Sequence, residues 1–276
     1  MLKSRVVTAI VLLAILLLAL FFMPPLLWAG LVVLMVMQGA TEWSRLSKLA
    51  GHPATLYWSL TVVMMAGLAW ADLYLAQDLR LVLQLVVYSL SALLWLVVVP
   101  SWLIAGWKVT NVYLMALVGW AVLLPTGLAM MDLREVAPAP WLLLFVMGLV
   151  WVADSAAYFA GRRFGKNKLA PSISPGKTWE GVSGAILGVS VYVVLVWSFS
   201  PLFSERQILP PLLLTAWWWL VLAVMGDLFE SAVKRQAGVK DSGALLPGHG
   251  GLLDRIDALT STLPLAALAL LFQGFN

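Results

Sequence analysis

Hydrophobic residues occur along this chain in long runs that short polar segments separate. Each run is close to the roughly 17–25 residues that an α-helix needs to cross the ~30 Å hydrocarbon core of a bilayer. The pattern predicts nine membrane-spanning helices, at residues 6–23, 25–41, 54–76, 81–99, 111–131, 140–161, 180–199, 211–233 and 258–274. The second is the least regular, because Pro24 and Pro25 leave only a tight turn before it.

The first run allows a second interpretation. Lys3 and Arg5 precede it, as basic residues precede the apolar stretch of a secretory signal peptide. No small-residue cleavage site follows this run, however, and the second run begins at once. We therefore expect a retained helix.

Composition decides the class of protein. Hydrophobic residues make up 62% of the 276 residues and charged residues only 11%, whereas a soluble domain carries roughly twice that charge. A chain of this length cannot hide so much apolar surface in a water-exposed fold. We expect an all-α, polytopic integral membrane protein without disulfides or thiolate metal sites, because cysteine is absent.

The basic residues predict the orientation. With the N-terminus in the cytoplasm, fourteen of the seventeen Lys and Arg residues lie on the inner face, and only Arg80, Arg134 and Arg206 lie outside. Such a bias follows the positive-inside rule. The two richest loops, 162–179 and 234–257, then share the cytoplasmic face. The net charge of +4 favours an anionic leaflet or a phosphate-bearing ligand, and nucleic acid fits poorly because the basic residues lie between spans.

Polar residues are unevenly divided between the two halves of the chain. We expect residues 1–140, with spans one to five, to form an N-terminal transmembrane region. Residues 141–276, with spans six to nine, form the expected catalytic region. The segment 226–257 alone holds five of the thirteen acidic residues, namely Asp227, Glu230, Asp241, Asp254 and Asp257.

Span eight should carry a polar stripe near its cytoplasmic end. Its members fall at i, i+3, i+4 and i+7 on one helix face, and they are Asp227, Glu230, Ser231 and Lys234. A carboxylate inside a span is costly unless it faces a polar cavity, so such residues usually mark function. The alternative is an internal ion pair in which Glu230 neutralises Lys234.

Span six offers a matching stripe, with Asp154, Tyr158, Gly161 and Arg162 on one face. The alternative for Asp154 is a single buried carboxylate that neighbouring Ser or Tyr groups satisfy. The following loop contains Ser-Pro-Gly-Lys-Thr at 174–178, which is not a P-loop because Pro171 stands where that motif needs Gly. This short basic loop before a helix N-terminus favours phosphate, unless it is only a positive-inside anchor.

The segment after span eight combines glycines with aspartates. Glycines around His249 allow a tight turn whose N–H groups can surround an anion. Asp254 and Asp257, together with Asp227, supply the hard oxygen ligands that suit Mg²⁺ or Mn²⁺. Two histidines and no cysteine argue against zinc. The alternative is that some aspartates only pair with the basic residues Arg235, Lys240 and Arg255.

Taken together, these segments resemble a known signature. Ser-Ala-Val-Lys-Arg at 231–235, Lys-Asp-Ser-Gly at 240–243 and Pro-Gly-His-Gly-Gly-Leu-Leu-Asp-Arg-Ile-Asp at 247–257 are similar to the phosphatidate cytidylyltransferases, the CDP-diacylglycerol synthases. The upstream segments Trp-Val-Ala-Asp-Ser-Ala-Ala-Tyr-Phe-Ala-Gly and Ser-Pro-Gly-Lys-Thr-Trp-Glu-Gly also resemble that family. The resemblance is densest over residues 150–260, shows no departure at the key positions, and looks bacterial in type.

This resemblance implies that CTP and phosphatidic acid react to give CDP-diacylglycerol and pyrophosphate, at the cytoplasmic face of the inner (plasma) membrane. It implies Mg²⁺, or Mn²⁺, held by Asp227 and Asp254, with a second cation as an option. The implied catalytic residues are Lys234, Arg235, His249 and Asp257. The implied substrate-binding residues are Asp154, Ser174, Lys177, Ser231, Lys240, Gly250 and Gly251. It also implies a homodimer.

Two other hypotheses stay open from the sequence. A proton-coupled or secondary transporter also carries intramembrane acids, although transporters usually show paired halves and sites near the bilayer midplane. A related lipid kinase or polyprenyl-phosphate enzyme would use another nucleotide. Turnover of CTP separates both hypotheses from a cytidylyltransferase.

Overall fold

The computed structural model describes residues 2–136, 140–199, 209–245 and 250–273, with the backbone alone for residues 2–10 and 12. Its helices are α1 (Leu2–Phe22), α2 (Pro25–Leu46), α3 (His52–Tyr74), α4 (Gln77–Leu93), the π-helical η1 (Leu94–Val98), α5 (Val99–Ala105), α6 (Val112–Glu135), α7 (Trp141–Phe164), α8 (Trp179–Phe199), α9 (Leu209–Ala237) and α10 (Leu253–Gln273). Two short strands, β1 (Lys168–Ala170) and β2 (Ser174–Thr178), pair antiparallel.

Eight helices of the described chain are long and apolar enough to cross a membrane, with α4, η1 and α5 joined as one of them. The first predicted span lies on α1, where the described apolar part, Leu13–Phe22, is shorter. The predicted all-α, polytopic membrane protein is confirmed.

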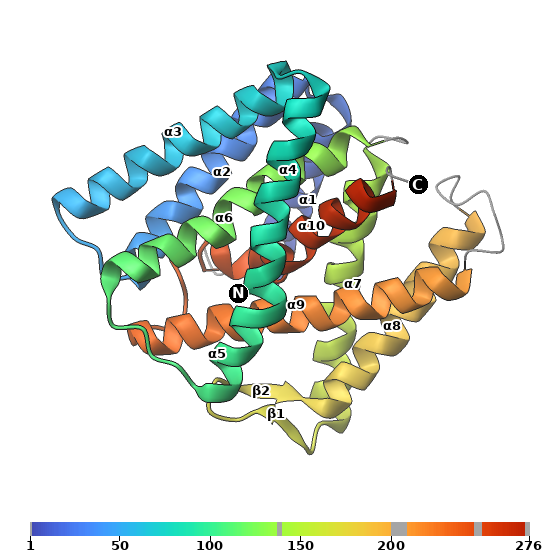
Figure 1. Ribbon diagram of the computed structural model, residues 1–276. Helices are drawn as coiled ribbons and strands as arrows, with labels where there is room; N and C mark the ends of the chain where they lie inside the picture. The colour runs from blue at the N-terminus through green and yellow to red at the C-terminus, as the bar shows by residue number, and fades with distance from the viewer. Residues whose placement is uncertain (1, 137–139, 200–208, 246–249, 274–276) are drawn as a thin grey trace.

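The bundle is organised around α10. This helix packs against α9, α6, α4 and α7, and it lies between two groups of helices (Figure 1). On one side α2, α3 and α6 pack against one another; on the other side α7 and α8 form an extensive pair, and α8 also packs against α9. The β1–β2 hairpin lies beside the start of α8, where β2 also contacts α9.

Aromatic packing fixes the position of α9. Phe229 is buried on this helix, and its ring lies 6.4 Å from Trp43, 5.6 Å from Trp95 and 5.4 Å from Trp102, measured between ring centroids. Such aromatic pairs add about 0.5–1.5 kcal/mol each beyond the area they bury. Because Phe229 immediately precedes Glu230, this packing also holds the polar stripe of α9 in place.

Hydrogen bonds from side chains at the ends of helices show which ends lie together. Gln236 at the end of α9 accepts from Val109 N–H and donates to Val109 C=O, in the loop after α5. Arg235 donates to Ile173 C=O in the hairpin turn. At the opposite ends of the helices, Arg134 on α6 donates to two carbonyl groups around the end of α1. Successive connections of the chain thus lie at opposite ends of the bundle, as expected for a chain that crosses a membrane repeatedly.

Several helices extend further into the polar segments than hydropathy predicts. The helix α2 continues to Leu46 rather than 41, α7 to Phe164 rather than 161, and α9 to Ala237 rather than 233. Likewise α10 begins at Leu253, so that Asp254 lies in its first turn. The helices continue through charged residues at these ends, whether buried, as Glu42 and Lys234 are, or exposed, as Arg162 is, so charge alone does not end them. The expected loop before α8 is partly a β-hairpin.

Small residues let α7 and α8 approach closely. A Cβ atom added at Gly188 would lie 2.6 Å from Ala156 Cβ, and one added at Gly184 would overlap Ala160 Cβ. Without a hydrophobic driving force in lipid, such close backbone packing is a main source of helix association. The pair α7–α8 therefore depends on its glycines.

We predict that Gly184→Ala destabilises the protein by about 1–3 kcal/mol, because the added methyl group overpacks the α7–α8 contact. Gly30→Ala on α2 is the matched control, since nothing lies within 4 Å of a Cβ atom there. Thermal unfolding of both variants in detergent measures the effect. Equal stability of the two variants would contradict the close packing of α7 on α8.

Candidate active site

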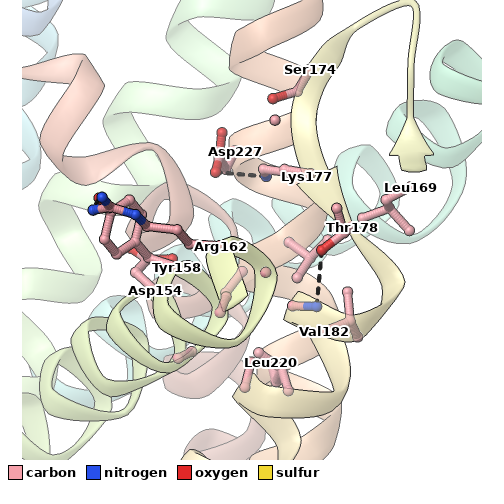
Figure 2. Close-up of a pocket in the computed structure, with 18 residues that line it drawn as sticks. Asp154, Tyr158, Arg162, Leu169, Ser174, Lys177, Thr178, Val182, Leu220 and Asp227 are labelled. Carbon is pink, nitrogen blue, oxygen red and sulfur yellow. Dashed lines mark hydrogen bonds and ion pairs between the residues drawn. The ribbon is translucent and has the colours of Figure 1, made fainter. Parts of the chain in front are cut away.

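A cavity of about 470 Å³ lies between α7, α8, α9 and the β1–β2 hairpin. Figure 2 shows Asp154, Tyr158 and Arg162 entering it from α7, Ser174, Lys177 and Thr178 from β2, and Asp227 from α9. The rest of its wall is small and apolar, and includes Ala157, Gly181, Val182, Ala185 and Leu220. The cavity thus has one charged side and one apolar side.

An ion pair closes the charged side of this cavity. Lys177 Nζ lies 2.6 Å from Asp227 Oδ2, and both side chains are partly accessible, at 22% and 31%. The hairpin brings Lys177 to α9, because Thr178 ends β2 and caps α8 by accepting from Gly181 N–H at 3.1 Å. The pair is therefore positioned by backbone structure and remains within reach of a ligand.

Asp154 faces the same cavity from α7. Its carboxylate lies in the electrostatic field of three neighbours: Asp227 repels its negative charge, and Lys177 and Arg255 attract it. Two turns after Asp154 on α7, Arg162 donates to Tyr158 Oη at 3.0 Å. The predicted stripe on α7 is therefore a wall of this cavity.

The residues of the predicted polar stripe on α9 contact one another along the helix and also contact α10. Ser231 Oγ donates to Asp227 Oδ1 at 3.3 Å, one turn from the cavity. Lys234 Nζ lies 3.4 Å from Glu230 Oε1, so the ion pair that the sequence left open is formed. Lys234 also lies 2.6 Å from Asp254 Oδ1, which joins α9 to α10.

Both carboxylate oxygens of Asp254 contact donor groups, Oδ1 that of Lys234 and Oδ2 those of the loop before α10. Its Oδ2 atom accepts from the N–H groups of Gly251 and Ser242 at 2.8 and 2.9 Å. Gly250 has φ of +81°, and a Cβ atom there would lie 2.6 Å from Asp254 Oδ2, so glycine is required. The N–H group of Gly251, which the sequence predicted to bind substrate, donates to the carboxylate of Asp254 in this structure.

Negative charge exceeds positive charge around α9. Asp257 on α10 lies within the repulsive field of Asp227, Glu230 and Asp154. The carboxylate of Glu230 is buried, and Lys234 Nζ lies 3.4 Å from its Oε1 atom. With Asp254, these are five carboxylates against the cations of Lys177, Lys234 and Arg255. Acidic side chains thus outnumber basic ones in this cluster.

No group of three or more acidic, His or Cys side chains within the described ranges is arranged to bind a metal ion by itself. A cation here would need oxygen ligands from outside the protein as well. Phosphate oxygens of a nucleotide are such ligands, and Mg²⁺ is often bound by one or two carboxylates together with substrate phosphates. Asp227 lies on the cavity wall and is paired with Lys177, whereas Asp254 lies outside that wall and is paired with Lys234.

Comparison with known proteins identifies the relatives of this chain. The sequence profile of the cytidylyltransferase family matches residues 3–273. The chain belongs to this family. It is 37% identical over 281 residues to a phosphatidate cytidylyltransferase of Haemophilus influenzae, with 96% of each chain covered. It is 38% identical over 276 residues to that of Pseudomonas aeruginosa, covering 100% of this chain and 99% of the relative.

A third relative matches a shorter part of the chain. The phosphatidate cytidylyltransferase of Thermotoga maritima is 45% identical over 130 residues, which is 45% of this chain and 46% of the relative.

Of the candidate site residues that the structure describes, four line the cavity, namely Asp154, Ser174, Lys177 and Asp227. Eight lie outside its wall, namely Ser231, Lys234, Arg235, Lys240, Gly250, Gly251, Asp254 and Asp257. Arg235 is exposed and bonds to Ile173 C=O at 3.4 Å and Val239 C=O at 3.3 Å, so it ties the hairpin to the end of α9. Lys240 is exposed in the loop that follows. His249 lies outside the described residues, and its role stays a prediction.

Sequence reasoning missed two residues. Thr178 caps α8, a role that Thr before an acidic first turn often signals. Glu42 on α2 is fully buried and contacts the loop before α10. Its signal was the spacing of Gly39, Trp43 and Leu46, which continues the buried face of α2 past the expected end of the span.

We predict that Lys234→Met lowers the free energy of unfolding by about 3–5 kcal/mol, because Glu230 and Asp254 would be left as buried charges without their shared cation. Arg235→Met, at the next and exposed position, should cost only about 0–1 kcal/mol. Unfolding by SDS in mixed micelles measures both. A small effect at Lys234 would show that the pair is hydrated.

Proposed function

We propose that this chain transfers the cytidylyl group of CTP to phosphatidic acid, giving CDP-diacylglycerol and pyrophosphate. The proposal is supported by the full-length relatives that carry the name phosphatidate cytidylyltransferase. The observation that carries it in the structure is the cavity in which Lys177 and Asp227 face an apolar wall. Such a cavity suits a phosphate that is attached to a lipid.

The two substrates need different surroundings. The glycerolipid keeps its acyl chains in the bilayer, and small apolar residues on α7 and α8, among them Ala157, Gly181 and Ala185, leave room for its upper part. CTP arrives from water, through the end of the bundle that carries the hairpin and the basic loops. We propose that this end faces the cytoplasm of a bacterial inner membrane, as the distribution of Lys and Arg predicts.

The chemistry needs positioning and charge neutralisation more than a covalent intermediate. An oxygen of the lipid phosphate attacks the α-phosphorus of CTP, and the bond from that phosphorus to the bridging oxygen breaks as pyrophosphate leaves with the electron pair. Lys177 and Lys234 are the cations best placed to bind phosphate oxygens, because each already neutralises an anion here. A phosphate that enters replaces the carboxylate as the partner of the ammonium group.

We propose that Asp227 and Asp254 hold a divalent cation, Mg²⁺ or Mn²⁺, together with phosphates of CTP. Support comes from the number of acidic side chains in this cluster, where Asp154, Asp227, Glu230, Asp254 and Asp257 outnumber the basic residues. When bound, the cation would neutralise phosphate oxygens and stabilise the leaving pyrophosphate. Asp227 and Asp254 would orient it, and Asp154 and Asp257 would complete the acidic surroundings. Whether a second cation binds, and whether the chain works as a homodimer, rest on the family resemblance alone.

The function is tested by incubating the purified protein with labelled CTP, phosphatidic acid and Mg²⁺. We predict a labelled liponucleotide and equimolar pyrophosphate, whose formation needs all three components. Replacing CTP by ATP tests the lipid-kinase alternative, and reconstituted vesicles without phosphatidic acid test a transporter. Turnover of ATP instead of CTP, or flux without turnover of CTP, would reject the proposal.

Asp227→Asn and Asp254→Asn should each lower kcat by a factor of roughly a hundred or more, since each removes a charge that orients the reacting phosphates. Both variants should still insert and fold, as gel filtration in detergent will show. Asp241→Asn is the matched control, because Asp241 is exposed in the same loop region. Activity that matches the control would remove the acid in question from the metal site.

A further inference from the structure

Glu42 is a buried acid far from the signature segments in sequence. It lies in the last turns of α2, and its exposed fraction is 0%. A buried carboxylate is unfavourable unless several donors compensate it. Gln38 Nε2, one turn earlier on α2, donates to Glu42 Oε1 at 2.9 Å. The remaining donors come from the other end of the chain.

Those donors belong to the start of α10. The N–H groups of Leu252 and Leu253 donate to the two oxygens of Glu42 at 2.8 and 2.9 Å. The first N–H groups of a helix have no partner within the helix, and the N-terminus of the helix dipole attracts a negative charge. Glu42 therefore caps α10 from a helix some two hundred residues away.

Glycines in the loop make room for this carboxylate. A Cβ atom at Gly243 would lie 3.0 Å from Glu42 Oε1, and one at Gly251 would overlap Glu42 Oε2. At both positions of the signature segments, a larger residue would crowd the carboxylate of Glu42. The loop and α2 have complementary shapes at this point.

Ser242 connects Glu42 to Asp254. Its hydroxyl group lies 2.7 Å from Glu42 Oε2 and 3.1 Å from Asp254 Oδ2, and its N–H donates to the same Asp254 oxygen. A hydroxyl group has one proton, so it can donate to one of the two carboxylates at a time. The direction of this hydroxyl group, and with it the orientation of Asp254, depends on Glu42.

We propose that Glu42 is a positioning residue for Asp254. By fixing the first turn of α10 and the hydroxyl group of Ser242, it sets the direction in which Asp254 Oδ1 faces Lys234 and the phosphate site. This inference rests on the proposed role of Asp254 and extends the machinery of the reaction to the N-terminal half of the chain.

The substitution Glu42→Gln tests the proposal with little change of volume. Its amide keeps one acceptor oxygen but turns an NH₂ group toward N–H donors, so the cap is broken while the side chain still fills its place. We expect hydrogen exchange of the amides at 250–256 in the metal-free protein to rise at least about fivefold, as the loss of a buried hydrogen bond implies. We also expect activity, or apparent affinity for Mg²⁺, to fall roughly ten- to a hundredfold.

The control is Thr41→Val, next to Glu42 on α2, where the hydroxyl group bonds only within the helix, to Met37 C=O. It should leave exchange, kcat and the Mg²⁺ dependence as in the unaltered chain. Glu42→Asp keeps the charge and should restore part of the lost activity. If Glu42→Gln does not fold, Ser242→Ala breaks the same link with α2 intact and should also weaken the Mg²⁺ dependence.

Two results would overturn the proposal. Unchanged exchange in Glu42→Gln would mean that the cap does not hold α10, and faster exchange with normal kcat and Mg²⁺ dependence would make Glu42 a structural cap only. Failure of the proposed function looks different. In that case the unaltered chain forms no liponucleotide, or Asp254→Asn keeps normal Mg²⁺ dependence, and the exchange experiment still reports on the Glu42 contact.

Discussion

The structure depends on balancing negative charge at one end of an apolar bundle. Carboxylates on α7, α9 and α10 gather where the dielectric is low, so each needs a cation or several donors nearby. Lys177 meets Asp227 from the hairpin, and Lys234 meets both Glu230 and Asp254 from within α9. These pairs hold three segments together, and one of the two ammonium groups, that of Lys177, also lines the cavity.

Packing elsewhere in the fold positions the helices that carry these charges. Three tryptophans pack on Phe229 and fix α9, and glycines let α7 and α8 close against each other to form the apolar wall of the cavity. The first helices are more than an anchor, because Glu42 on α2 reaches the start of α10. The cavity combines charged residues with apolar ones, and under the proposed function this mixed lining receives both a nucleotide from water and a headgroup from the bilayer.

Hydropathy and helical periodicity predict most of the fold. The spans follow from apolar runs, and the stripe from Asp227 to Lys234 follows from spacing on one helix, because both are local properties. The partners of those charges are not local: nothing in the sequence shows that Lys177 pairs with Asp227, or that Glu42 caps α10. The hairpin at 168–178 was missed because its pairing covers few residues. The helix ends were placed too early because hydropathy treats charged residues as loop, although these helices continue through them.

The metal site that we propose has Asp227 and Asp254 bind one divalent cation together with the phosphates of CTP. Binding of Mn²⁺ in detergent with CTP and without lipid, followed by electron paramagnetic resonance, tests this site. We predict that Asp227→Asn and Asp254→Asn each weaken Mn²⁺ binding by a factor of roughly ten or more, and that the double variant is little worse than either. Mn²⁺ binding that stays unchanged in either single variant would contradict it.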